Sequence, residues 1–216
     1  MPEQLDATEA RILGALVEKQ LTTPEYYPLT LNSLVTACNQ KNNRDPVMSL
    51  DERTVTNAIE QLRDRNLVYV FYGSTSRVPK YKHMLPSVYE LDPAGTAVMA
   101  VLMLRGPQTL GELRERTGRM HEFTGLGEVQ ETLDGLMRRD EPLVVKLERL
   151  AGKKEARFAH LLSGEIDVES LAAAQPATRS GFDPSRIEGL EIEVTALREE
   201  VTRLGQLFDE FKKQFE

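Results

Sequence analysis

The sequence holds few side chains in arrangements that support catalysis. Its three histidines, His83, His121 and His160, are far apart in the chain. No H-E-x-x-H, G-x-S-x-G or P-loop motif supplies a metal site, a nucleophile or a phosphate-binding lysine. We therefore expect a protein that is not an enzyme, with no catalytic residues, no cofactor and no metal site.

Cys38 is the only cysteine, which excludes an internal disulfide framework and a Cys-rich zinc site. It ends a predicted helix, one turn after Leu34, and no histidine stands close to it in the sequence. Free cysteine is among the most buried residue types, so the prediction is a buried structural thiol with low reactivity.

A polar helix face offers the chemistry of DNA recognition. In the helix predicted near residues 50–65, Val55, Ala58, Ile59 and Leu62 recur at helical spacing and should face the core. The polar residues between them include arginine, which suits guanine, and asparagine and glutamine, which suit adenine. The candidate DNA-contacting residues are Arg53, Asn57, Gln61 and Arg63 on this helix, Lys41 and Arg44 in the loop before it, and Arg77, Lys80 and Lys82 on the following β-hairpin.

Charge gives mixed support for a nucleic-acid partner. The whole chain carries a net charge of -7, and residues 166–216 contribute -5 of it, whereas residues 41–82 have a local excess of +3. Glu60 and other acids on the candidate helix would repel phosphate. The alternative to DNA binding is a scaffold whose helix faces bind proteins, and the asparagines of residues 39–43 could shape the loop rather than touch a ligand.

Polar residues that precede segments with apolar residues at helical spacing predict where the helices begin. Three of them have an acidic residue three positions on, as in a capping box, and one precedes a proline. The predicted starts are Asp6 (with Glu9), Ser49 (with Glu52), Asp92 (before Pro93) and Thr109 (with Glu112).

The spacing of apolar residues repeats once over about 80 residues, and each copy reads as three helices followed by a β-hairpin. This is the order of a winged helix-turn-helix domain. The predicted fold is mainly α with small β-hairpins (α+β), in two tandem winged-helix domains with a C-terminal coiled-coil helix. The predicted parts are a first domain over 1–90, a second over 91–163, a flexible linker over 164–185 and the coiled-coil helix over 186–216.

The last segment has apolar residues at alternating spacings of three and four, as in a heptad repeat. β-Branched residues at a and leucine at d favour a parallel pair of helices, so we expect a homodimer; the alternative is a helix that packs on its own domain. The candidate dimerisation residues are Ile187, Leu190, Val194, Leu197, Val201, Leu204, Phe208 and Phe211.

A cytoplasmic protein with no membrane contact is expected. No run of 18 apolar residues occurs, and the longest apolar stretch, residues 97–104, is too short to span a bilayer. The first residues lack the basic and then apolar pattern of a signal peptide.

Two segments resemble the YceH-like family of bacterial proteins: Ala37-Cys38-Asn39-Gln40-Lys41-Asn42-Asn43-Arg44-Asp45-Pro46-Val47 and Thr23-Pro24-Glu25-Tyr26-Tyr27-Pro28-Leu29-Thr30. The resemblance implies two winged-helix domains followed by a helical tail. It implies no catalytic or ligand residues, because the family is uncharacterised in function. The combined prediction is a homodimeric, DNA-binding regulator.

Overall fold

The computed structural model describes residues 4–72, 78–148, 155–164 and 203. Contacts divide the chain into one compact unit over residues 1–168 and a second over 169–216. The predicted linker from residue 165 on, all the candidate dimerisation residues and Arg77 lie outside the described residues. Within the described residues, no helix is both long and apolar enough to cross a membrane.

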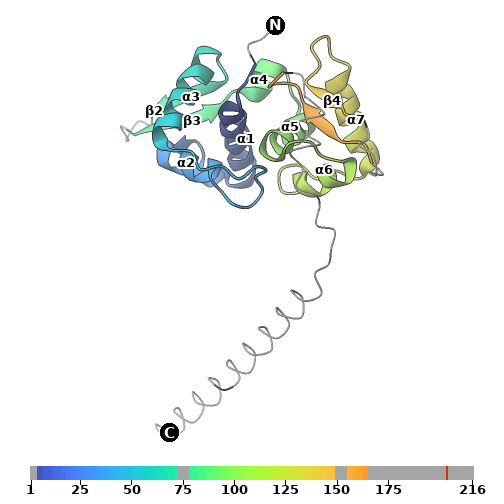
Figure 1. Cartoon of the computed structure of the whole chain (residues 1–216), viewed down its shortest axis with the longest axis horizontal. Coiled ribbons are helices and arrows are strands. Elements are labelled where there is room, and N and C mark those ends of the chain that lie inside the picture. The colour runs from blue at the N-terminus through green and yellow to red at the C-terminus, as the bar shows by residue number, and fades with distance from the viewer. Residues whose placement is uncertain (1–3, 73–77, 149–154, 165–202, 204–216) are drawn as a thin grey trace. The chain divides into compact units, whose positions relative to one another are not determined.

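The described part of the chain is a mixed α/β structure with seven α-helices and small antiparallel sheets (Figure 1). The first half contains α1 (Ala7–Thr22), the 3-10 helix η1 (Pro24–Tyr26), β1 (Leu29–Thr30), α2 (Leu31–Cys38), α3 (Glu52–Asp64), β2 (Val68–Tyr72) and β3 (Pro79–His83). The remainder contains α4 (Leu85–Tyr89), α5 (Pro93–Arg105), α6 (Leu110–Thr117), α7 (Leu126–Met137), β4 (Val144–Lys146) and β5 (Phe158–His160).

The two halves share an order of elements. In the first, the short β1 precedes α2 and pairs with β3, giving an antiparallel sheet in the order β1-β3-β2. In the second, Gln108 precedes α6 and forms a bridge with Phe158 of β5, which pairs with β4. Both halves therefore place a short extended segment, two helices and a hairpin after a long buried helix.

Local sequence explains most helix starts. Asp6 and Thr109 form complete capping boxes with Glu9 and Glu112, and Asp92 caps α5, as predicted. The predicted Ser49 cap is wrong, because Asp51 caps α3 through a bond from the Thr54 N–H. Aspartate two residues later offers the same acceptor chemistry, and the Asn39 side chain bonds both backbone groups of Leu50, directly before Asp51.

The short helix α4 was not expected. It occupies most of residues 84–91, between the first hairpin and α5, and ends at Glu90 in a left-handed conformation. Leu85 of α4 is fully buried, so the connection is part of the core rather than a free linker.

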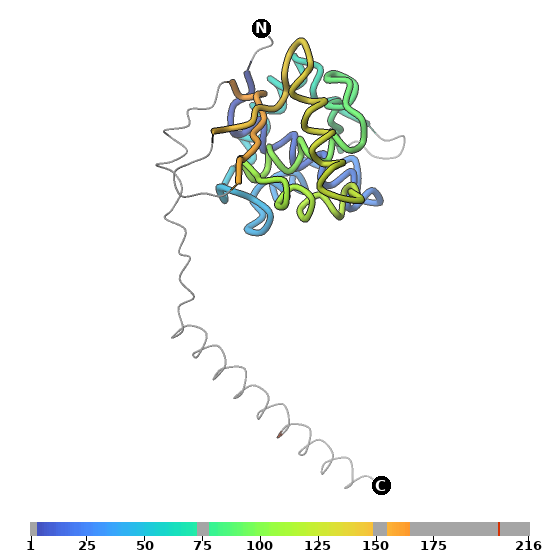
Figure 2. Tube along the Cα trace, turned by 90° about the vertical axis from the view of Figure 1, so that its right-hand side faces the viewer, coloured from blue at the N-terminus to red at the C-terminus, as the bar shows by residue number. Residues whose placement is uncertain are grey.

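The helices α1 and α5 lie side by side at the centre of the compact unit (Figure 1). Residues 9–18 of α1 and 95–104 of α5 are buried, and most of their apolar side chains belong to one continuous hydrophobic core. In the view of Figure 2 the second half faces the viewer and the blue helices of the first half lie behind it. Gly14 allows the close approach: a Cβ atom there would lie 2.8 Å from Leu104 Cγ.

We expect Gly14→Ala to destabilise the protein by roughly 1–3 kcal/mol, because overpacking at the α1–α5 contact outweighs the gain in helix propensity. Chemical denaturation measures the change. Gly135→Ala is the matched control: it also lies within a helix, and nothing stands within 4 Å of its Cβ position. This control should stabilise the fold by about 0.5–1 kcal/mol. Equal effects of the two substitutions would contradict the close-contact explanation.

Candidate nucleic-acid interface

The inner face of α3 is confirmed as part of the core. Val55, Ala58, Ile59 and Leu62 are at most 5% exposed, as the helical spacing predicted. Burying this face fixes the rotation of the helix about its axis, so the opposite face must point to solvent. The Asp51 cap fixes where the helix begins.

Arg53, Asn57 and Gln61 form one row along the outer face of α3. They are spaced by four residues, so they lie on neighbouring turns of the helix. All three are exposed, and their side chains make no hydrogen bond with any residue that the structure describes. The row spans about 12 Å at 1.5 Å per residue, which corresponds to three or four stacked base pairs.

The end of α3 lies beside the sheet. Burial raises the pKa of Tyr81 on β3, and the charges of Tyr72, Arg63 and Glu60 also act on it. Arg63 therefore stands near the hairpin rather than in the row of Arg53, Asn57 and Gln61. It remains exposed, whereas Lys80 and Lys82 flank Tyr81 on β3 and point to the opposite side of the sheet.

The outer face of the first sheet carries lysines and aromatic rings in alternation. On β3, Lys82 is paired with Tyr69 of β2, and Lys80 is paired with Phe71. Directly paired residues point to the same side of a sheet. Lys82, Tyr69 and Phe71 are exposed and Lys80 is partly exposed. We call Tyr69, Phe71, Lys80 and Lys82 the hairpin face.

The sequence analysis did not identify the exposed aromatic residues Tyr69 and Phe71. The signal was present in Leu67-Val68-Tyr69-Val70-Phe71-Tyr72, where the aromatic residues alternate with smaller apolar ones. Val68 is buried and Tyr69 is 60% exposed. Alternation alone did not say which set faces the core, because both sets are apolar.

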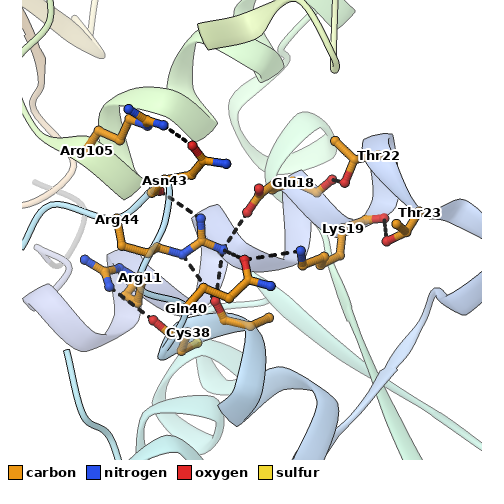
Figure 3. A network of polar contacts seen from close by, with 11 residues as sticks. Arg11, Glu18, Lys19, Thr22, Thr23, Cys38, Gln40, Asn43, Arg44 and Arg105 are labelled. Atoms are coloured by element: carbon orange, nitrogen blue, oxygen red, sulfur yellow. Dashed lines mark hydrogen bonds and ion pairs between the residues drawn. The ribbon is translucent and has the colours of Figure 1, made fainter. Parts of the chain in front are cut away.

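The prediction that Arg44 contacts DNA needs correction. The Arg44 side chain is fully buried and forms an ion pair with Glu18 of α1 at 2.5 Å. It also donates to the backbone oxygens of Ala37 and Asn43 and to the Gln40 side chain (Figure 3). The neighbouring candidate, Lys41, is exposed and makes no hydrogen bond or ion pair with the described residues.

A second buried arginine, which the sequence analysis missed, stands close to Arg44. Arg11 of α1 is 1% exposed and donates to the backbone oxygens of Cys38 and Pro46. Burial lowers its pKa, and the nearby charge of Arg44 lowers it further. Ala37 and Cys38 end α2, so the two guanidinium groups satisfy helix carbonyls that otherwise lack partners. No pattern of spacing marks a residue such as Arg11, because its partners lie on other elements.

Asparagines fasten the loop between α2 and α3. The Asn39 side chain bonds both backbone groups of Leu50, donating to its oxygen at 2.8 Å and accepting from its nitrogen at 2.7 Å. Asn43 has a positive φ of 61° and accepts hydrogen bonds from Arg44 and Arg105. The interpretation that these asparagines shape the loop is thus confirmed for Asn39 and Asn43.

Cys38 is buried, as predicted. Burial raises the pKa of its thiol to about 12, although the charges of Arg44 and Arg11 act in the opposite direction. A thiol with so high a pKa is not ionised at neutral pH and is a poor nucleophile.

The chain was compared with known proteins. Residues 5–153 match a family model described as a protein of unknown function, DUF480. A UPF0502 protein of Pelobacter propionicus is 52% identical over 98% of both chains. A UPF0502 protein of Geobacter sulfurreducens is 49% identical over 98% of both chains. The UPF0502 protein YceH of Salmonella paratyphi C is 46% identical over 94% of this chain and 97% of its own.

The chain belongs to the UPF0502 family. The resemblance to YceH-like proteins is thereby confirmed. The family match spans both halves of the compact unit, and the UPF0502 relatives also align with nearly all of the remaining residues. The UPF0502 family is uncharacterised in function, so its members assign no role to α3 or to the hairpin face.

We expect Arg44→Ala to destabilise the protein by about 3 kcal/mol, because it leaves the Glu18 carboxylate largely buried without its partner. Lys41→Ala, three residues away in the same loop but exposed, should change stability by less than about 0.5 kcal/mol. Urea denaturation of both variants measures the difference. A stable Arg44→Ala variant would show that Arg44 is not a structural residue.

His83 should make stability fall in acid. Its ring is buried, neither ring nitrogen has a hydrogen-bond partner among the described residues, and burial lowers its pKa to about 4. The unfolded chain takes up a proton below about pH 6.5, whereas the folded chain does so only near pH 4. The histidine therefore costs stability as the pH falls through this window.

We expect this histidine to lower the free energy of unfolding by about 2–3 kcal/mol at pH 4.5 relative to pH 7.5. His83→Leu should remove this part of the pH dependence and leave the contribution of the other groups. Denaturant titrations of both proteins at the two pH values measure it. An unchanged pH dependence in the variant would mean that the folded protein protonates His83 normally.

Proposed function

We propose that the first half is a winged helix-turn-helix domain that binds double-stranded DNA in a regulatory role, with α3 in the major groove. The order α1, β1, α2, α3, β2, β3 and the sheet order β1-β3-β2 support this proposal. The second half is a further domain of the same kind, packed against the first. The role is binding and not catalysis.

The row of Arg53, Asn57 and Gln61 carries the proposal. Each of these side chains can make two hydrogen bonds to a base edge, arginine to guanine and the two amides to adenine. None is engaged by the described part of the protein. The helix beneath them is fixed by its buried face, so on binding the three side chains lose freedom but the backbone does not.

The hairpin face supplies contacts that do not depend on sequence. Lys80 and Lys82 suit phosphates, and the rings of Tyr69 and Phe71 suit sugar or base surfaces. In this proposal Arg77 acts with them, as predicted from the sequence.

Acidic residues on α3 favour specific over general binding. Glu52, Glu60 and Asp64 are exposed on the same helix and oppose any phosphate that approaches it. Because these acids weaken the attraction to DNA of any sequence, the base contacts determine which duplexes bind tightly.

The heptad pattern of residues 187–215 supports a homodimer, which would place two copies of α3 on two half-sites. Because the proposed partner is DNA, we expect the protein in the compartment that holds DNA. In the bacterial relatives this compartment is the cytoplasm.

Asn57→Ala should cost roughly 1–3 kcal/mol of binding free energy on the preferred duplex and have little effect on unrelated duplexes. The combined variant Lys80→Gln, Lys82→Gln should weaken all duplexes alike. It should also reduce the slope of log affinity against log salt by about two. Fluorescence anisotropy over a range of salt concentrations measures both changes.

The two variants are controls for each other, because one removes a base contact and the other removes phosphate contacts. If the parent protein fails to bind any duplex at low salt, or if neither variant changes binding, the DNA proposal is wrong. A scaffold that binds proteins would then be the better interpretation.

A further inference from the structure

A polar cleft lies where the two halves meet, at the carboxyl ends of α1, α5 and α6. It consists of two adjoining cavities of about 330 and 340 Å³. Both are lined by Glu18, Thr22, Asn43 and Arg119. Their volumes lie within the range of small-molecule sites, about 300–1,000 Å³.

Positive charge gathers in this cleft. Its cationic lining residues are Lys19, Lys41, Arg105, Arg116 and Arg119, and its acidic ones are Glu18 and Glu115. The Glu18 charge is already neutralised by its ion pair with Arg44, which lines neither cavity (Figure 3). The carboxyl ends of the three helices offset about half a charge each. Arg116 is also paired with Glu112, so an excess of about one to two positive charges remains.

Several of these cations have donors to spare. Arg119 and Lys41 are exposed and make no hydrogen bond or ion pair with the residues that the structure describes. Arg105 donates to the Asn43 side chain, and Lys19 donates to Gln40 (Figure 3). Burial lowers the pKa of Arg105, and the like charges of Arg116 and Arg44 lower it further, although the charges of Glu18 and Asp45 act in the opposite direction. An anion bound here would relieve that repulsion.

One wall of the cleft is apolar. Val101 and Leu104 of α5, which are 3% exposed, line the same cavity as Met120, Arg105 and Arg116. A bare inorganic ion would leave this wall unused. A ligand with an anionic head and a small apolar body would satisfy both surfaces.

We propose that the cleft binds a small organic phosphate monoester. The phosphate would lie among Arg105, Arg116 and Arg119, with its organic part against Val101, Leu104 and Met120. Arginine binds phosphate with two parallel hydrogen bonds, and the dianionic charge of a monoester matches the excess positive charge of the site. Lys41 and Asn43 belong to the loop that leads to α3, so the ligand would contact the segment that positions this helix.

Phenyl phosphate and benzenesulfonate are suitable probes, because they share a ring and differ in charge and oxygen arrangement. Isothermal titration of the full-length chain should show binding of phenyl phosphate at least tenfold tighter than binding of benzenesulfonate. Arg119→Gln should weaken phenyl phosphate binding about tenfold. Arg114→Gln is the matched control, since Arg114 is an exposed arginine of α6 that lines neither cavity, and it should leave binding unchanged.

Three outcomes would overturn the proposal: no measurable phenyl phosphate binding, equal binding of both probes, or equal losses in Arg119→Gln and Arg114→Gln. Duplex binding by the same variants separates this site from the DNA surface. If Arg119→Gln weakens duplex and phenyl phosphate alike, the cleft is a DNA-backbone contact and not a small-molecule site. The inference does not depend on DNA binding, because phenyl phosphate titration is measured without DNA.

Discussion

Two buried guanidinium groups at the carboxyl end of α2 determine how the rest of the first half is arranged. Arg11 and Arg44 lie against the last carbonyls of this helix, and the Glu18 carboxylate pairs with Arg44. A buried charge is stable only when its hydrogen bonds are satisfied. The chain after α2 follows a path that presents the oxygens of Asn43 and Pro46 to the two arginines, and Arg11 also bonds the oxygen of Cys38 at the end of the helix.

The direction of α3 follows from this loop. Asn39 joins the start of the loop to its end at Leu50, and Asp51 then begins the helix. The buried face of α3 then fixes the rotation of the helix about its own axis. The exposed row on α3 thus depends on contacts that are made away from the row itself. On its other side the same loop reaches the second half, where Arg105 contacts Asn43.

The close packing of α1 and α5 makes the two halves one body. Gly14 permits that contact, and the cleft opens at its end, where Glu18 and Thr22 of α1 meet Leu104 and Arg105 of α5. A ligand in the cleft would therefore contact the loop between α2 and α3, and a duplex on α3 would contact the helix that this loop positions. Such an arrangement allows binding at one place to change affinity at the other, provided that the loop differs between the two states.

Local patterns predicted local features well. The inner face of α3 and the caps at Asp6, Asp92 and Thr109 depend on residues within a few positions of one another, and all of them are present. Arg44 was misplaced because its partner Glu18 is 26 residues away and nothing in the spacing reveals the pair. The exposed aromatic residues of β2 were missed because its two faces are both apolar, and only the packed structure distinguishes them.

DNA recognition is tested most directly by selection from a pool of random duplexes with the full-length chain, followed by sequencing of the bound fraction. Recognition by α3 predicts enrichment of a shared motif with guanine and adenine at adjacent positions. It also predicts that the same selection with the Asn57→Ala variant loses preference at an adenine. A bound fraction with the same sequence distribution as the starting pool, from a protein that remains folded, would contradict recognition by α3.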